Sequence, residues 1–303
     1  MKIEESVFFG KPIRSLSRWY GNLTRDEVKG EALRTRIRMC VAPAKTKRRL
    51  AAARPFLSSQ YDGFRRNGHL AMRLPGYERL TPVFRRIIEE SLCGDRPQAG
   101  SKKNLINLLK PGHLTRHPEI MDAIFDEAFL LPVFNYYGYA PELASLGLFL
   151  TPQNEDVEKS QLWHIDSYDP HHLKHITLVE DVTMDNGPFT FLPIPESNAI
   201  RQAVGKLSRG LDFESKFADR LRNNIAHVGS AGEGMFVDVS QCLHQGGRTR
   251  AGRRILFFVH FATFADYLQV EKNYQTGLFF QHEPELVEQF ATDPVRAIML
   301  RRD

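Results

Sequence analysis

The pattern of apolar and polar positions divides the chain into a first part typical of helices and a later part typical of strands. In the first part, the segment TRDE at 24–27 fits a capping box and predicts a helix that runs to about Met39. The pair Thr81-Pro82 predicts a helix start before VFRRIIEESLC, and Pro118 predicts another before EIMDAIFDEAFLL. The first third of the chain is therefore predicted to be mostly helical.

From about residue 145 the apolar runs become shorter and are bounded by Gly, Pro, Asn and Asp. They are rich in Phe, Val, Ile, Leu and Thr, as in SLGLFLTP, HITLVEDV, PFTFLPI, GMFVDV and RRILFFVHFAT. This composition is typical of strands, and the series predicts a mainly antiparallel sandwich or barrel. A polar stretch at 196–226 is predicted to be a helical insert, and the tail at 284–300 to form closing helices.

Composition is that of a soluble globular protein, with 303 residues of which 42% are hydrophobic and 25% charged. It excludes a disordered tail, a collagen-like fibre and a small disulfide scaffold. No run of about 18 apolar residues predicts a membrane span, and the first residues lack the apolar region of a signal peptide. The three cysteines are far apart, which fits a reducing compartment. We therefore expect a cytoplasmic protein without a membrane partner; its oligomeric state is left open.

Charge is divided unevenly between the two parts. Residues 1–117 hold 25 lysines and arginines against 10 acidic residues, a net +15, whereas the rest holds 16 against 26, a net −10. A basic region suggests an anionic partner such as nucleic acid, a nucleotide, CoA or an acidic glycan. Because only KTKRR at 45–49 forms a basic run, a solvated helical surface or a contact with the acidic part is the preferred interpretation.

The segment QLWHIDSYD places His164 and Asp166 two residues apart. On a strand, such side chains project from the same face, so an imidazole nitrogen and a carboxylate oxygen converge. A third ligand is available from His244, which follows the predicted strand GMFVDV. Two histidines and one carboxylate form the facial triad of non-haem Fe(II) oxygenases, which leaves positions open for a bidentate cosubstrate and O₂.

A cosubstrate such as 2-oxoglutarate needs a cation for the carboxylate that does not chelate the metal. Arg254 lies ten residues after His244, at the start of the next predicted strand, and its guanidinium can bind a carboxylate with two parallel hydrogen bonds. Arg253 is the competing candidate, because adjacent residues of a strand face opposite sides.

These motifs together resemble the phytanoyl-CoA dioxygenase-like branch of the Fe(II)/2-oxoglutarate-dependent oxygenases, over about residues 130–270. The matching segments are HID at 164–166, NGPFTFLP at 186–193, GEGMFVDVSQCLHQGG at 232–247 and RRILFFVHFAT at 253–263. The resemblance implies a mainly β core with a helical surround (α+β), in the form of a double-stranded β-helix or jelly roll. The expected organisation is a helical region at 1–130, a core at 131–270 and a helical extension at 271–303, in one compact unit.

By position, the resemblance implies that His164, Asp166 and His244 bind Fe(II). It also favours Arg254 over Arg253 as the partner of the 2-oxoglutarate C5 carboxylate, with O₂ as the second cosubstrate. The implied activity is hydroxylation of a C–H bond in a small or medium organic molecule, with release of succinate and CO₂. An anionic substrate, desaturation and cyclisation stay open. A carboxylate at the second ligand position favours hydroxylation over halogenation, since related halogenases have a small residue there.

The chain departs from the family in places that concern substrate binding. It has PIPES at 193–197 where many members have PGSH, Ile165 where Gln is common, and Gly246 where some members have Ser. The resemblance therefore implies a class of reaction and no particular substrate. Three further histidines, His171, His172 and His175, are interpreted as loop and strand-end residues and not as metal ligands.

Three alternatives stay open at this point. The first is the same chemistry on a nucleic acid or protein, which the basic first third supports. The second is a non-oxygenase jelly-roll protein whose metal serves binding or hydrolysis, since zinc hydrolysis also uses His and carboxylate ligands around an open site. The third is a barrel that binds ligands without catalysis, against which the complete triad and the arginine argue.

Overall fold

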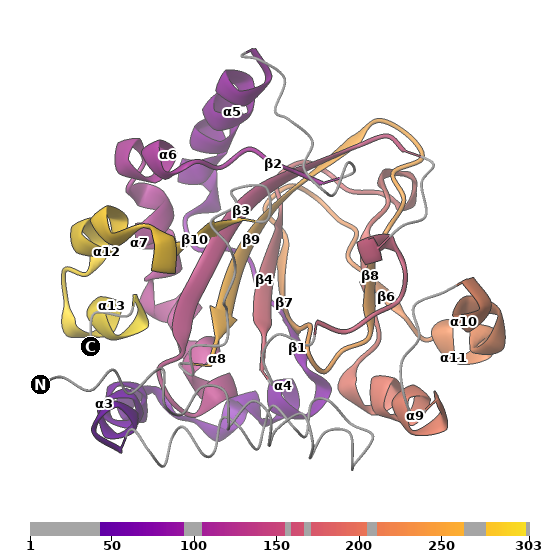
Figure 1. Cartoon of the computed structure of the whole chain (residues 1–303), viewed down its shortest axis with the longest axis horizontal. Coiled ribbons are helices and arrows are strands. Elements are labelled where there is room, and N and C mark those ends of the chain that lie inside the picture. The colour runs from indigo at the N-terminus through magenta and orange to yellow at the C-terminus, as the bar shows by residue number, and fades with distance from the viewer. Residues whose placement is uncertain are drawn as a thin grey trace, which may run out of the picture.

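The computed structural model describes residues 43–93, 105–154, 159–166, 171–204, 211–263 and 277–300. Two antiparallel sheets face each other, and helices cover the outer side of the larger one (Figure 1). The capping-box helix predicted from residue 24 lies outside the described residues. Among the described helices, none has the length and apolar character needed to cross a membrane.

The larger sheet has the strand order β1-β7-β4-β9-β3-β10, and β2 pairs with β3 beside this path. Its strands are β1 (His69–Ala71), β2 (Ile106–Asn107), β3 (Glu142–Pro152), β4 (Leu173–Leu178), β7 (Gly234–Asp238), β9 (Arg253–Ala262) and β10 (Leu278–Phe279). The smaller sheet has the order β6-β5-β8. Its strands are β5 (Phe189–Phe191), β6 (Ile225–Ala226) and β8 (His244–Gly246). This arrangement is a jelly roll, which confirms the predicted fold class.

Strand β9 shows how the sequence pattern builds the two layers. Ile255, Phe257 and Val259 belong to the core shared with the helices, whereas Leu256 and Phe258 pack toward the smaller sheet. Because both faces of the strand are covered, its sequence is an almost continuous apolar run and does not alternate with polar residues. Strands β1, β2 and β10 also join this sheet, although they lie outside the predicted core at 131–270.

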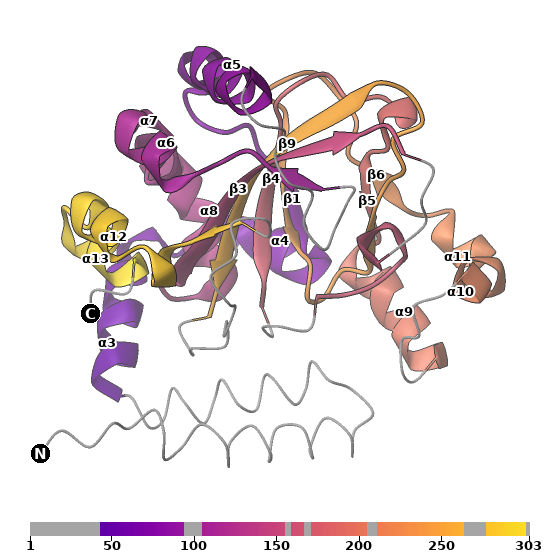
Figure 2. The ribbon, with the colours of Figure 1, turned by 45° about the horizontal axis from the view of Figure 1, so that its top comes forward.

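Helices from both ends of the chain form the layer outside the larger sheet (Figures 1 and 2). Those that contribute to its core are α5 (Tyr77–Cys93), α6 (Pro111–Arg116), α7 (Glu119–Ile124), α8 (Glu127–Tyr137), α12 (Pro284–Phe290) and α13 (Pro294–Met299). Helices α3 (Pro43–Ala53) and α4 (Asp62–Asn67) precede them and add Ala53 and Phe64 to the same core. The predicted insert forms α9 (Ile194–Val204), α10 (Leu211–Lys216) and α11 (Ala218–Leu221), on the side of the smaller sheet.

One predicted helix start and one predicted helix length differ from the structure. Helix α5 begins at Tyr77, so Pro82 lies inside it, and the Thr81 hydroxyl donates to the Tyr77 carbonyl (3.1 Å) and does not cap the helix. The helix begins earlier because Tyr77 and Leu80 continue its buried face upstream of the proline. The segment after Pro118 forms two helices, since Asp126 caps α8 by accepting a hydrogen bond from the backbone N–H of Ala128 (2.9 Å).

Two motif glycines allow the turns beside the smaller sheet to touch. Gly187 has a positive φ of 68°, and a Cβ there would lie 2.4 Å from the backbone of Arg248. A Cβ at Gly247 would lie 2.5 Å from the backbone of Gly187. The NGP turn and the HQGG segment therefore require glycine at these positions so that β5 and β8 can pair.

Burial predicts that two leucines contribute very differently to the free energy of unfolding. Leu148 on β3 is fully buried, whereas Leu50 on α3 is 44% exposed. Replacing Leu148 with Ala should lower the free energy of unfolding by about 2–5 kcal/mol, because it leaves a cavity. The matched Leu50→Ala change should cost less than about 1 kcal/mol. Urea unfolding of both variants is the measurement, and equal losses would contradict this account of the core.

Candidate metal centre

The two histidines of the predicted triad are joined through their backbones. His164 lies outside the named strands but forms an antiparallel bridge with His244, the first residue of β8. Each backbone N–H donates to the other residue's carbonyl, at 2.9 Å from His164 and 2.8 Å from His244. The two rings therefore lie next to each other, with centroids 4.3 Å apart.

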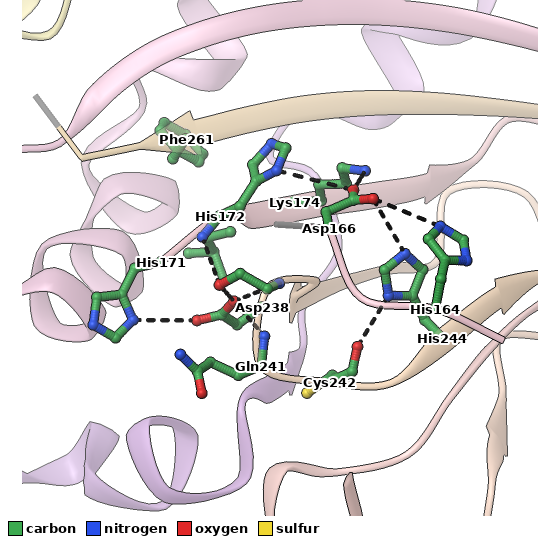
Figure 3. Close-up of polar contacts among 12 residues, drawn as sticks. His164, Asp166, His171, His172, Lys174, Asp238, Gln241, Cys242, His244 and Phe261 are labelled. Atoms are coloured by element: carbon green, nitrogen blue, oxygen red, sulfur yellow. Dashed lines mark hydrogen bonds and ion pairs between the residues drawn. The ribbon is translucent and has the colours of Figure 1, made fainter. Parts of the chain in front are cut away.

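Asp166 completes the set from the segment that follows His164. Its backbone N–H donates to the Val239 carbonyl (2.8 Å), and its Oδ1 lies 3.6 Å from His164 Nε2 and 4.0 Å from His244 Nε2 (Figure 3). The three ligand atoms lie within 4.8 Å of one another, so these residues can hold a metal ion.

Both imidazoles are held in the form that binds a metal through Nε2. His164 Nδ1 lies 2.7 Å from the Leu162 carbonyl, and His244 Nδ1 lies 2.9 Å from the Cys242 carbonyl. A carbonyl only accepts, so each Nδ1 carries a proton, and Nε2 is the atom of each ring that can offer a lone pair to a metal. Burial, together with His164, lowers the pKa of His244 well below its usual value, which keeps this ring neutral.

Lys174 on β4 is a partner of the site that the sequence analysis did not single out. Its Nζ lies 2.7 Å from Asp166 Oδ2, on the side away from the two histidines (Figure 3). Burial alone would raise the pKa of the Asp166 carboxyl, but Lys174 and the nearby imidazoles outweigh it and hold this pKa well below its usual range. Asp166 is thus ionised, with Oδ2 bound to Lys174 and Oδ1 facing the histidines.

Arg254 and Arg253 lie on opposite faces of β9, as strand geometry requires. The Arg253 side chain is exposed and its Nε donates to Glu180 Oε2 (3.0 Å). Arg254 is buried, and its Nη2 donates to Thr151 Oγ1 on β3 (3.2 Å). A Cβ placed on Gly246 of β8 would lie 4.0 Å from this Nη2, so the guanidinium points across the interior to the smaller sheet.

The Arg254 guanidinium has unused hydrogen-bond donors. Its Nε and Nη1 are buried and have no hydrogen-bond partner among the residues that the structure describes. Burial lowers its pKa to about 10, so it is still charged at neutral pH. A buried cation with free donors is costly unless an anion binds it. This position therefore fits a carboxylate supplied by a ligand.

The three histidines of the second cluster are separated in space. His171 is half exposed, and its Nδ1 lies 3.4 Å from Asp238 Oδ2. His175 is buried on the helix side of β4, where its Nε2 donates to the Met72 carbonyl (2.8 Å). Only His172 faces the candidate metal centre, with Nδ1 3.9 Å from Asp166 Oδ2. None of the three belongs to the metal-holding set found among the described residues.

The turn that leads into His244 is held from both sides. Asp238 at the end of β7 accepts from the Ser240 backbone N–H (2.9 Å) and from its hydroxyl (2.6 Å). The Ser197 hydroxyl of α9 accepts from the Leu243 backbone N–H (2.8 Å), and Leu243 packs with Trp163 and the insert helices. The insert therefore supports both ligand-bearing segments.

Sequence comparison gives no match, either to a protein family or to a curated protein. Comparison of structures gives distant likenesses. EctD from S. alaskensis, solved with 2-oxoglutarate and 5-hydroxyectoine, is 15% identical over 73% of this chain and 84% of its own, with a TM-score of 0.49. HygX from Streptomyces hygroscopicus, with nickel and 2-oxoglutarate bound, is 12% identical over 69% and 88%, with a TM-score of 0.43.

A third similar structure is SnoK, a non-haem alpha-ketoglutarate-dependent carbocyclase from nogalamycin biosynthesis. It is 15% identical over 68% of this chain and 84% of its own, with a TM-score of 0.46. Because all three likenesses are distant, a function for this chain has to rest on its own residues.

The metal-holding set predicts that Fe(II) binds to the protein under anaerobic conditions. His164→Ala or His244→Ala should weaken binding at least about 100-fold, since even loss of a residue that only orients a ligand costs 10–100-fold. His69→Ala, on β1 outside the site, is the control and should bind iron like the wild type. Iron content after desalting is the measurement; full occupancy in both ligand variants would disprove the assignment.

Buried His175 predicts a specific loss of stability in acid. Burial lowers its pKa to about 3, against about 6.5 in the unfolded chain. Between these two pKa values the unfolded chain binds the proton more readily than the folded chain. The contribution of neutral His175 to the free energy of unfolding is therefore fully present above about pH 6.5 and is lost as the pH falls toward 3. One such group changes the free energy of unfolding by up to about 1.4 kcal/mol per pH unit.

His175→Gln should therefore reduce the dependence of the unfolding free energy on pH between about pH 7 and pH 5. The measurement is urea unfolding at several pH values. Leu148→Ala is the control, because it lowers stability at every pH but leaves the slope unchanged. An unchanged slope in His175→Gln would show that other groups cause the acid sensitivity.

Proposed function

We propose that this protein is an Fe(II)- and 2-oxoglutarate-dependent oxygenase, in which His164, Asp166 and His244 hold the iron. One observation carries the proposal: a compact set of two imidazoles and one carboxylate shares the interior with a buried guanidinium, two of whose nitrogens have no hydrogen-bond partner among the described residues. Zinc-dependent hydrolysis would explain the three ligands, but it does not require an anion that binds the buried guanidinium of Arg254.

The spacing between the two parts suits a five-carbon dicarboxylate. His244 and Gly246 are two residues apart on β8 and face the same side, about 7 Å apart along the strand. Gly246 approaches the guanidinium of Arg254, so the cation lies about one such step beyond the metal ligands. A 2-oxoglutarate molecule that chelates the metal at one end can therefore reach Arg254 with its C5 carboxylate.

The cofactor set, when bound, supplies oxidation of a C–H bond coupled to release of succinate and CO₂. The chain's own residues prepare the site for it. The carbonyls of Leu162 and Cys242 fix the orientation of both imidazoles, and Arg254 neutralises the cosubstrate's distal charge. Apolar side chains of β9, among them Leu256 and Phe258, line the interior and exclude water. No side chain is required as a general base.

The substrate that we propose is a small or medium organic molecule, and the reaction is hydroxylation. The resemblance of the motifs to the phytanoyl-CoA dioxygenase-like branch supports this choice. In the described part of the basic region, α5 packs its apolar face on the sheet, which supports a structural role for those residues. No described feature favours a nucleic acid or a protein as the substrate.

The arginine pair gives a matched test of the cosubstrate. Arg254→Ala should weaken 2-oxoglutarate binding by about 2–5 kcal/mol, since it leaves a desolvated carboxylate unpaired. Arg253→Ala removes the same charge from an exposed pair and should leave binding unchanged. The measurement is anaerobic titration of the Fe(II)-loaded protein with 2-oxoglutarate, and iron content should be equal in all three proteins.

Two outcomes would contradict the proposal. Loss of 2-oxoglutarate binding in Arg253→Ala alone would place the cosubstrate on the other face of β9. Equal binding in both variants would remove 2-oxoglutarate from the site. Screening of small organic molecules for stimulated succinate release then identifies the substrate.

A further inference from the structure

The interior face of the larger sheet carries polar side chains at two separate ends. Arg254 lies at one end of β9, and His260 follows six residues later on the same face, about 20 Å along the strand. Leu256 and Phe258 separate them and are apolar. The cosubstrate proposed above accounts for the first end only, so the second end is available for another ligand.

Three strands contribute to this second end. Ser145 of β3 and Lys174 of β4 are both in register with His260 of β9, one on each side. Directly paired residues face the same side of a sheet, and neighbouring strands lie about 4.8 Å apart. His172 lies two residues before Lys174, and its ring packs edge-on against that of His260, with centroids 5.2 Å apart. We name Ser145, His172 and Lys174 the polar row.

The polar row contains buried atoms that need a partner. His172 is 5% exposed, and neither of its ring nitrogens has a hydrogen-bond partner in the described parts of the chain. The Ser145 hydroxyl is fully buried and equally unpaired there. Buried polar groups are nearly always hydrogen-bonded, and exceptions require an explanation. Two exceptions in one row, beside a candidate metal centre, point to a bound ligand.

Lys174 adds charge and further donors to the row. Its ammonium lies 2.7 Å from Asp166 Oδ2, and its side chain is 14% exposed. An ammonium has three N–H donors, so the contact with Asp166 leaves others for a ligand. Lys174 thus connects the polar row directly to the carboxylate proposed as a metal ligand (Figure 3).

We propose that the polar row binds a carboxylate of the primary substrate, next to the iron and on the side away from Arg254. This inference rests on the proposed function and names the class of its substrate. Lys174 supplies the charge, and the Ser145 hydroxyl and a ring N–H of His172 supply hydrogen bonds to the two oxygens. The substrate's carboxylate then fixes which of its C–H bonds faces the metal.

The sum of charges around the candidate metal centre supports a substrate with one negative charge. Fe(II) brings two positive charges, Lys174 and Arg254 bring one each, and Asp166 brings one negative charge. With 2-oxoglutarate contributing two negative charges and both histidine ligands neutral, one positive charge remains. A monocarboxylate balances it, whereas a neutral molecule leaves the excess charge in a site with little water.

Acetate and its neutral counterpart acetamide are probes for this site. The full chain is loaded with Co(II) and 2-oxoglutarate, which form a complex that does not turn over. Accelerated relaxation of the probe's methyl protons then reports binding close to the paramagnetic ion. We expect saturable binding of acetate with an affinity at least about ten-fold higher than that of acetamide, since hydrogen bonds to a charged group are the stronger ones.

Variants test whether the polar row causes this preference. Lys174→Met should raise the dissociation constant of acetate about ten-fold or more, and Ser145→Ala about three-fold. Lys47→Met removes the same charge from the exposed face of α3 and should change nothing. Ser145→Ala removes no group that touches a metal ligand in the structure, so it still tests the row if Lys174→Met loses its metal.

Uptake of Co(II) and of 2-oxoglutarate is measured first in each protein, which separates the two proposals. Failure of the wild type to bind them would overturn the proposed function. Normal uptake with equal affinities for acetate and acetamide would overturn the carboxylate site alone. Binding of acetate that is insensitive to both Lys174→Met and Ser145→Ala would show acetate on the metal only, and would overturn it equally.

Discussion

The backbone pairing of His164 with His244 is the interaction on which the site depends. These residues lie eighty positions apart in the chain, and the two hydrogen bonds of their bridge place both rings side by side. Asp166 follows His164 by two residues and reaches the same point because its own N–H is bound to the turn after β7. The fold thus determines the site through main-chain contacts, and side-chain chemistry is added to a frame that is already fixed.

The two faces of β9 have different roles, because its side chains alternate with a period of two residues. One face of the strand builds the core with the helices, and the other lines the space between the sheets. The interior face places Arg254 at one end and His260 at the other, with apolar residues between them. Two polar ends are thus separated by an apolar stretch, and the proposed cosubstrate and substrate sites lie at opposite ends of it, on either side of the candidate metal centre.

Much of this arrangement could be predicted from the sequence. The long apolar runs located β3, β4, β7 and β9, and the HxD motif with a later histidine located the candidate ligands. Strands β1, β2 and β10 were not predicted, because each has only two or three residues and they were not recognised as apolar runs bounded by turn residues. The start of α5 was misplaced because Pro82 is tolerated inside the helix when burial of Tyr77 and Leu80 extends it. Lys174 was missed because its contact with Asp166 depends on how two segments cross, which local patterns do not contain.

The hydrogen bonds from the ligand imidazoles to carbonyls two residues earlier have a consequence for the choice of metal. These hydrogen bonds already orient both imidazole rings, so the rings need little rotation when an ion binds. Such a prepared set of two nitrogens and one oxygen accepts many divalent ions, and intrinsic affinity rises from Mn²⁺ through Fe²⁺ to Ni²⁺ and Cu²⁺. Iron is therefore not the ion that this geometry binds most tightly. Which ion fills the candidate site depends on the metal supply where the protein folds, so under the proposed function a chain produced with excess nickel or zinc would lack activity.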